Sequence, residues 1–73
     1  MKGYVARIMT AKGFGFIRSP ENRKDYFFHR SDLIGDWDDM VVRHESGIKI
    51  YVEFTPNDLP KGPRAAGVHE TEE

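Results

Sequence analysis

The 73-residue sequence predicts an all-β protein, a small closed or partly closed barrel of five short strands. Two runs, residues 13–18 and 25–29, alternate between one face and the other with the period of two that strands require. The connection at residues 19–24 is short and rich in turn-forming residues, so the two runs should form a hairpin. Closure into a barrel would leave no strand edge exposed to aggregation.

The other strands follow from the same periodicity. The chain from about Gly3 to Met9 has apolar residues on both faces, so we expect a bend or bulge there. A last strand should run from about Gly62 to His69. The most regular strand lies between these two, with Lys49, Tyr51 and Glu53 facing outward and with Ile48, Ile50, Val52 and Phe54 facing the core.

The segments between the strands show few helix signals. Residues 55–60 have the composition of a turn or loop. One short helical turn is predicted near residues 31–34, ending at Gly35. Residues 36–47 form a long connection to which the sequence assigns no structure, and its acidic residues are interpreted as a solvated loop: Asp36, Asp38 and Asp39.

Composition excludes several classes of protein. The chain has no cysteine, so disulfides and thiolate metal clusters are excluded. The longest apolar runs are too short for a transmembrane helix or for the core of a signal peptide, and we expect a cytoplasmic protein. The net charge of −1 is unevenly distributed, because residues 1–30 carry +5 and residues 31–73 carry −6. This asymmetry suggests an anion-binding surface in the N-terminal half.

Aromatic residues gather on one face of the predicted hairpin. Phe14 and Phe16 share a face whose opposite side is glycine and isoleucine, and Phe27 and His29 should lie beside them on the next strand. Lys12, Arg18 and Arg30 border this face. Aromatic rings with a basic fringe are typical of surfaces that hold single-stranded nucleic acid, since bases stack on rings while cations follow phosphates. The competing interpretation is that these rings, and the histidine with them, simply pack; a metal role for the histidine is disfavoured.

Two motifs in this region resemble those of a known family. Residues 12–17 (KGFGFI) resemble the first RNP motif of cold-shock domains, and residues 26–29 (YFFH) resemble the second. The likeness covers almost the whole chain: Gly3 and Val5 match the family's opening Gly-x-Val, Ser31 stands at the family distance after the second motif, and residues 62–66 resemble its Gly-Pro-x-Ala-Ala segment.

The resemblance implies a five-stranded antiparallel OB-type Greek-key barrel over residues 1–70, followed by an acidic tail at 71–73 that we expect to be disordered. It also implies low-specificity binding of single-stranded RNA or DNA, as an RNA chaperone or regulator of gene expression. By motif, Lys12 would contact the nucleic-acid backbone. Asp25 would lie near the binding edge, with a role in local hydrogen bonds as its alternative. The bases would stack on Phe14, Phe16, Phe27 and His29.

The chain departs from the family pattern at two aromatic positions. Arg7 stands where the family usually has a tryptophan, and Arg30 replaces the aromatic residue that commonly follows the histidine. Guanidinium groups can stack on bases or pair with phosphates. The alternative is that both are solvated or paired with Asp25 or Asp32. Trp37 could serve as a binding-loop aromatic or could cap the bottom of the barrel, and the sequence leaves both open.

The sequence therefore predicts a nucleic-acid-binding module without catalysis, cofactor or metal, acting as a monomer. The chain has no cysteine and no phosphate-binding loop, and no Ser/His/Asp set or pair of carboxylates in an identifiable cleft suggests an enzyme. The alternative is an OB-fold protein-interaction module that has partly lost nucleic-acid binding. The candidate binding residues are Lys12, Phe14, Phe16, Phe27, His29, Arg7, Arg30, Arg18, Asp25 and Trp37.

Overall fold

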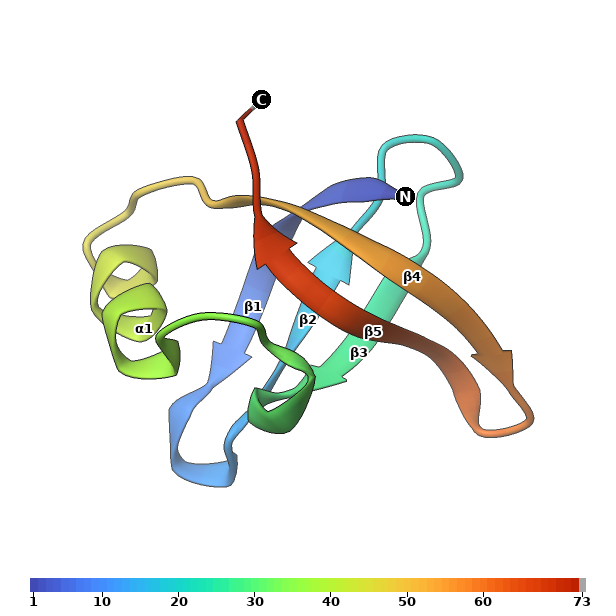
Figure 1. Cartoon of the computed structure of the whole chain (residues 1–73), viewed down its shortest axis with the longest axis horizontal. Helices are drawn as coiled ribbons and strands as arrows, with labels where there is room; N and C mark the ends of the chain where they lie inside the picture. The colour runs from blue at the N-terminus through green and yellow to red at the C-terminus, as the bar shows by residue number, and fades with distance from the viewer. Residues whose placement is uncertain (73) are drawn as a thin grey trace.

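The computed structural model describes residues 1–72. Within these residues the chain forms five strands, one α-helix and two short 3-10 turns (Figure 1). Their order is β1 (Lys2–Met9), η1 (Thr10–Lys12), β2 (Phe14–Arg18), β3 (Asp25–His29), η2 (Arg30–Asp32), α1 (Trp37–Glu45), β4 (Tyr51–Leu59) and β5 (Gly62–Glu70).

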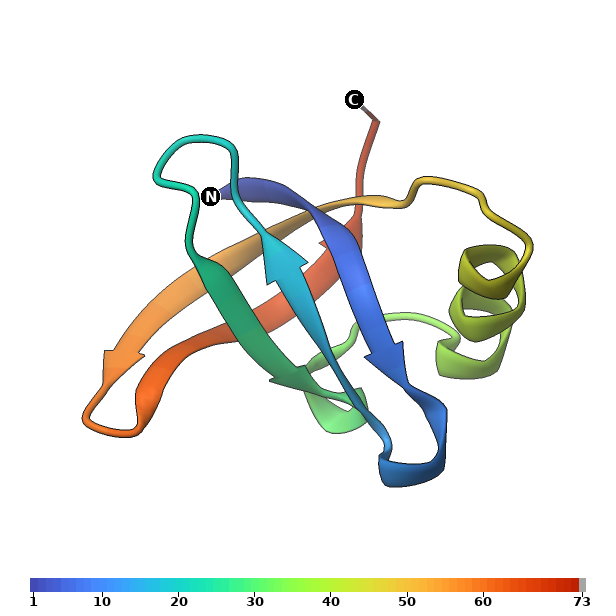
Figure 2. The same cartoon turned by 180° about the vertical axis from the view of Figure 1, so that it is seen from behind.

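The strands close into a barrel in the order β1-β2-β3-β5-β4, which confirms the predicted fold class (Figures 1 and 2). Neighbouring strands are antiparallel except β3 and β5, which pair in parallel through Phe27 and Arg64. The β2–β3 hairpin also forms as predicted. The expected helical turn near residues 31–34 is η2, where Asp32 accepts a hydrogen bond from the backbone N–H of His29 and the His29 side chain accepts one from that of Ser31.

Strand β1 contains the irregularity that its mixed faces predict. Val5 pairs with Ile17 on β2, but Arg7 pairs with Phe16, so Ala6 is an extra residue in the ladder. Val5 is buried, whereas Ala6 and Arg7 are both exposed. The bulge therefore places Arg7 on the outer surface of the barrel, beside Phe16.

Gly15 allows β1 and β3 to approach β2 closely. A Cβ atom at this position would lie 2.7 Å from the carbonyl oxygen of Arg7 and 2.9 Å from the ring of Phe28. Gly13 has a different role, because it ends η1 with a φ of +71°, a left-handed conformation that favours glycine. Gly15 thus allows the neighbouring strands to lie close to β2, and Gly13 allows the turn that precedes β2.

The core consists of ten buried side chains from the barrel and α1. Phe28 and Ile17 are completely inaccessible to solvent, and burial of side chains of this size stabilises a fold by about 1.5–3 kcal/mol each. Trp37 packs at the edge of this core. The ten residues are Val5, Ile17, Tyr26, Phe28, Met40, Ile50, Val52, Phe54, Ala65 and Val68.

Two predictions about the segment around β4 are wrong. Residues 55–60 were expected to form a turn or loop, but β4 continues to Leu59 and pairs with β5 along this length. Pro56 is tolerated there because a proline disturbs a ladder little where its missing N–H is not needed. Ile48 was expected to face the core, but it lies before β4 and is 49% exposed. The β4–β5 hairpin projects beyond the rest of the barrel (Figures 1 and 2).

The connection that the sequence left unassigned contains α1, which lies beside β1 at one end of the barrel (Figures 1 and 2). Its acidic residues are solvated but do not form a loop. Asp36 is the N-cap, accepting a hydrogen bond from the backbone N–H of Asp39 at 3.3 Å, and Asp38 and Asp39 occupy the first turn. Acidic residues there are favoured by the helix dipole. Met40 and Val41 bury the inner side of the helix.

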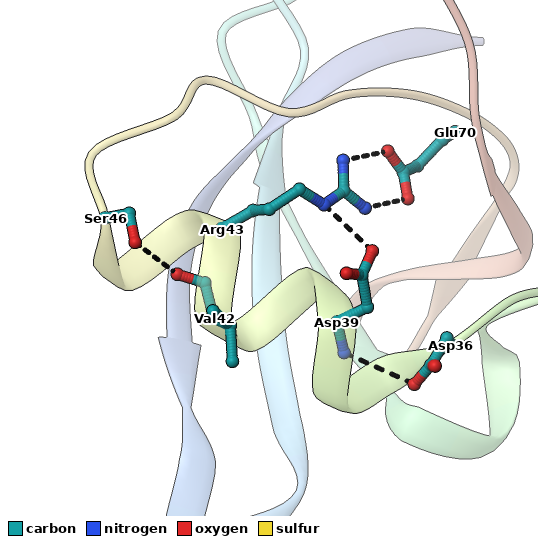
Figure 3. Close-up of polar contacts among 6 residues, drawn as sticks. All are labelled: Asp36, Asp39, Val42, Arg43, Ser46 and Glu70. Carbon is teal, nitrogen blue, oxygen red and sulfur yellow. Dashed lines mark hydrogen bonds and ion pairs between the residues drawn. The ribbon is translucent and has the colours of Figure 1, made fainter.

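An ion-pair network fastens α1 to β5 (Figure 3). Both terminal nitrogens of Arg43 bond to the carboxylate of Glu70, with Nη1 2.7 Å from Oε1, while Nε donates to Asp39 at 3.0 Å. Glu70 is the last residue of β5. The next residue, Thr71, also contacts the sheet, because its backbone N–H donates to the carbonyl of Tyr51 at 2.9 Å. Of the acidic tail predicted to be disordered, Glu73 lies outside the described residues.

Candidate nucleic-acid interface

Three phenylalanine rings, Phe14, Phe16 and Phe27, are in mutual contact on the outer surface of β2 and β3; we term them the aromatic cluster. The centroids of Phe14 and Phe27 are 5.2 Å apart, and those of Phe16 lie 5.9 Å from Phe14 and 6.0 Å from Phe27. All three rings are partly exposed. The prediction that these three rings share one face of the β2–β3 hairpin is therefore confirmed.

Strand alternation explains why the cluster faces outward. On β2 the inward-facing Ile17 is fully buried and pairs with the buried Tyr26 of β3, and Gly15 pairs with the buried Phe28. The barrel interior is thus filled by these residues, and the phenylalanines are left on the solvent side. Partly exposed aromatic rings gathered in one patch offer planar apolar surface to a ligand.

His29 lies opposite Phe14 in the ladder and is held by Ser31. The ring Nδ1 accepts a hydrogen bond from the backbone N–H of Ser31 at 3.1 Å and lies 2.9 Å from its hydroxyl oxygen. With Nδ1 accepting, the neutral ring carries its proton on Nε2. These contacts fix the ring at the end of the aromatic surface.

Arg64 adds a cation that the sequence interpretation did not include among the binding residues. Its guanidinium carbon lies 5.6 Å from the centroid of Phe27, and its Nη2 donates to Asp32 at 3.0 Å. Asp32 also accepts the backbone N–H of His29 at 2.9 Å. Arg64 is brought here by the parallel pairing of β5 with β3, a contact between residues distant in the sequence.

A hollow of about 400 Å³ continues the surface from the aromatic cluster to the β4–β5 hairpin. Lys61 contributes a second cation from the turn of that hairpin, which the sequence interpretation also missed. The hollow is lined by Phe16, Asp25, Phe27, Leu59, Lys61, Gly62, Pro63 and Arg64.

Arg18 and Asp25 form an ion pair across the β2–β3 hairpin. Arg18 Nε donates to Asp25 Oδ1 at 2.9 Å, and Nη2 donates to Oδ2 at 3.3 Å. The hydrogen bonds to Arg18 lower the pKa of the Asp25 carboxyl, and those bonds raise the pKa of Arg18. Asp25 thus makes the local contacts that were the alternative to a binding role.

A comparison of the sequence with protein families agrees with this geometry. The family model described as the 'Cold-shock' DNA-binding domain matches residues 1–71. The chain belongs to the cold-shock domain family. This family is one of nucleic-acid-binding proteins, in agreement with the prediction of a protein that is not an enzyme.

Individual cold-shock proteins resemble the chain along nearly its whole length. Cold shock-like protein CspC of Buchnera aphidicola is 35% identical over 68 residues, which cover 93% of this chain and 91% of the relative. CspC of Escherichia coli (strain K12) has the same identity and coverage. Probable cold shock protein A of Mycolicibacterium smegmatis is 33% identical over 67 residues, with 92% of each chain covered.

The two arginines that replace aromatic residues of the cold-shock pattern are exposed. Arg7 lies beside Phe16 in the β1–β2 ladder, and Arg30 follows His29, with its side chain against Gly13. Within residues 1–72 neither forms an ion pair, since Asp25 is bound by Arg18 and Asp32 by Arg64. Arg7 and Arg30 are therefore not paired with Asp25 or Asp32, and both guanidinium groups face solvent. Lys12, at the end of η1, is exposed as well.

Trp37 does not lie with the other candidates. Its ring contacts Phe28, with centroids 5.9 Å apart, and Phe28 belongs to the buried side of β3. Trp37 is the first residue of α1 and packs against the core, so the structure gives it the role of a cap on the barrel.

The described residues 1–72 hold no group of three or more His, Asp or Glu side chains that could bind a metal ion. In the same residues no helix has the length and apolarity needed to cross a membrane.

The site offers planar rings, exposed cations and a fixed imidazole N–H, which suit π-stacking and phosphate contacts.

Proposed function

We propose that the chain binds single-stranded RNA or DNA with low sequence specificity through the aromatic cluster and its basic fringe. The observation that carries the proposal is the mutual contact of Phe14, Phe16 and Phe27 on the solvent side of the barrel. Every base has a π-face, so stacking on these rings would be tolerant of sequence. Through such binding we propose that the protein acts as an RNA chaperone or a regulator of gene expression.

Magnitudes favour stacking as the main source of affinity. Each base stacked on an aromatic ring contributes about 1–3 kcal/mol by truncation, so three rings outweigh a few phosphate contacts. The net charge of −1 does not oppose this, since the exposed cations Arg7, Arg30 and Lys12 lie in the positively charged N-terminal half. His29 adds a further ring with a hydrogen-bond donor at Nε2.

Direct titration tests the proposal. We would titrate the protein with oligothymidylate, oligouridylate and an A-rich strand by calorimetry at low salt, because Trp37 packs against Phe28 at the edge of the core and is a poor reporter for the aromatic cluster. We expect saturable binding with pyrimidine-rich strands. If no strand binds at low salt, the proposal fails and a protein-interaction role for the same surface becomes the better explanation.

A further inference from the structure

A second aromatic pair lies on the outer surface, on the far side of Arg18 from the aromatic cluster. Tyr4 on β1 pairs directly with Tyr51 on β4, and both rings are partly exposed. The ammonium nitrogen of Lys49 lies 4.4 Å from the centroid of Tyr4 and 5.4 Å from that of Tyr51. We term Tyr4, Tyr51 and Lys49 the tyrosine platform.

The tyrosine platform borders its own hollow. This hollow has a volume of about 320 Å³, and most of its lining is apolar. Its rim includes the cation Lys2 and, near the C-terminus, the carboxylate of Glu72. Neither tyrosine belongs to the buried core, and both are partly exposed at this hollow. The lining residues are Lys2, Gly3, Tyr4, Pro20, Lys49, Tyr51, Val52, Thr71 and Glu72.

A series of shallow hollows links this platform to the aromatic cluster. Phe16 lines one hollow together with Arg7 and Arg18. Arg18 then lines the next, together with Tyr4 and Arg23. Tyr4 also lines the hollow of the tyrosine platform. Each hollow shares a lining residue with its neighbour, so the hollows follow one another along this face, and several basic side chains line them.

We propose that a bound single strand of nucleic acid continues from the aromatic cluster past Arg18 onto the tyrosine platform. A base stacks on the rings of Tyr4 and Tyr51, while Lys49 and Lys2 pair with the adjacent phosphates. This inference rests on the proposed function and adds a binding segment to it. Aromatic rings interleaved with cations are the pattern that such strands require.

The present position of Lys49 is compatible with this role. Its ammonium group lies over the Tyr4 ring, and an exposed cation–π contact is weaker than base stacking. The long lysine side chain can move to a phosphate and leave the ring face to the base. Glu72 opposes a phosphate at the same rim, so Glu72→Gln should tighten binding of a strand that reaches the platform.

Strand length separates the two segments experimentally. Oligothymidylates of about four and about eight nucleotides fall within the site sizes of OB folds. The three rings of the aromatic cluster and His29 suffice for the bases of the shorter strand, so only the longer strand has bases left over for the tyrosine platform. Tyr51→Thr removes the ring and keeps a β-branched residue in the strand, and Tyr51→Phe keeps the ring as the matched control. We expect Tyr51→Thr to weaken binding of the longer strand at least about fivefold and to leave binding of the shorter strand unaffected. Tyr51→Phe should bind both strands as the wild type does.

The wild-type protein supplies a second measurement that does not depend on how the variant folds. The ring protons of Tyr4 and Tyr51 should shift in NMR spectra on addition of the longer strand and not of the shorter one. Phe27→Ala, measured in the same assay, should weaken both strands and so reports on the proposed function. The extended path is wrong if the tyrosine ring protons do not shift with the longer strand, or if Tyr51→Thr binds that strand as the wild type does. The role of the aromatic cluster is then judged separately, from the affinity of Phe27→Ala. A free thymidine nucleotide that shifts the tyrosines when the longer strand does not would also contradict a continuous path.

Discussion

Arg43 and Glu70 join the α-helix to the last strand through paired hydrogen bonds between a guanidinium group and a carboxylate (Figure 3). The two residues are 27 positions apart in the sequence. Hydrogen bonding to Arg43 lowers the pKa of the Glu70 carboxyl, and Asp39 on the same helix holds the other edge of the guanidinium. This contact fixes α1, and with it Trp37, against the barrel.

We predict that Glu70→Gln lowers the unfolding midpoint by no more than a few degrees, because pairs that are this exposed stabilise weakly. Since the folded-state pKa of Glu70 is lowered, the stabilisation is complete above the ordinary glutamate pKa of about 4.3 and is lost as pH falls through the folded-state value. Thermal unfolding followed by circular dichroism at several pH values measures both effects. Glu21→Gln makes the same charge change in the exposed β2–β3 loop and should leave the midpoint unchanged; an equal loss in the two variants would contradict the role given to Arg43.

Gly15→Ala should destabilise the fold by about 1–3 kcal/mol, the usual range for overpacking. The added Cβ would lie 2.7 Å from a backbone oxygen of β1, so the strands themselves must move apart. Urea unfolding gives the change in free energy. A variant with the wild-type midpoint would show that β1 and β2 are less tightly apposed than the structure indicates.

Binding should depend only shallowly on salt. If two to four phosphates are neutralised by the exposed cations, the logarithm of the affinity should fall against the logarithm of salt concentration with a slope of about −1.5 to −3. Arg7→Gln should make the slope shallower by about 0.7 if Arg7 contacts one phosphate. A much steeper slope would mean that charge, and not stacking, carries the affinity.

Arg7→Trp should strengthen binding to pyrimidine-rich strands severalfold. Arg7 is exposed and lies next to Phe16, so a tryptophan there would extend the aromatic cluster by another stacking surface. Lys24→Trp, in the exposed loop between β2 and β3, controls for the addition of a tryptophan elsewhere. A weaker complex with Arg7→Trp would show that Arg7 makes specific contacts of its own.

The parts of the molecule that depend on local patterns could be predicted from the sequence. Phe14, Phe16 and Phe27 share a face because alternation and one short hairpin suffice to bring them together. The position of Arg64 could not be predicted in the same way, since it reaches Phe27 only through the parallel pairing of β3 and β5.

The helix and the end of β4 were missed for different reasons. Asp36 and Gly47 are ordinary signals for the start and end of a helix, but the helix between them has only nine residues and just two buried side chains. In residues 55–60 turn-forming composition was overridden by pairing with β5, a contact that local sequence does not encode.

The role of the aromatic cluster is tested most directly by the affinity of Phe27→Ala and Phe14→Ala for oligothymidylate. Both rings lie outside the core, so the variants should keep the folded circular dichroism spectrum while losing affinity at least about tenfold. Val42→Ala, which shortens an exposed apolar side chain on α1, should bind as the wild type does. Undiminished affinity in both folded phenylalanine variants would contradict the assignment of this face to nucleic acid.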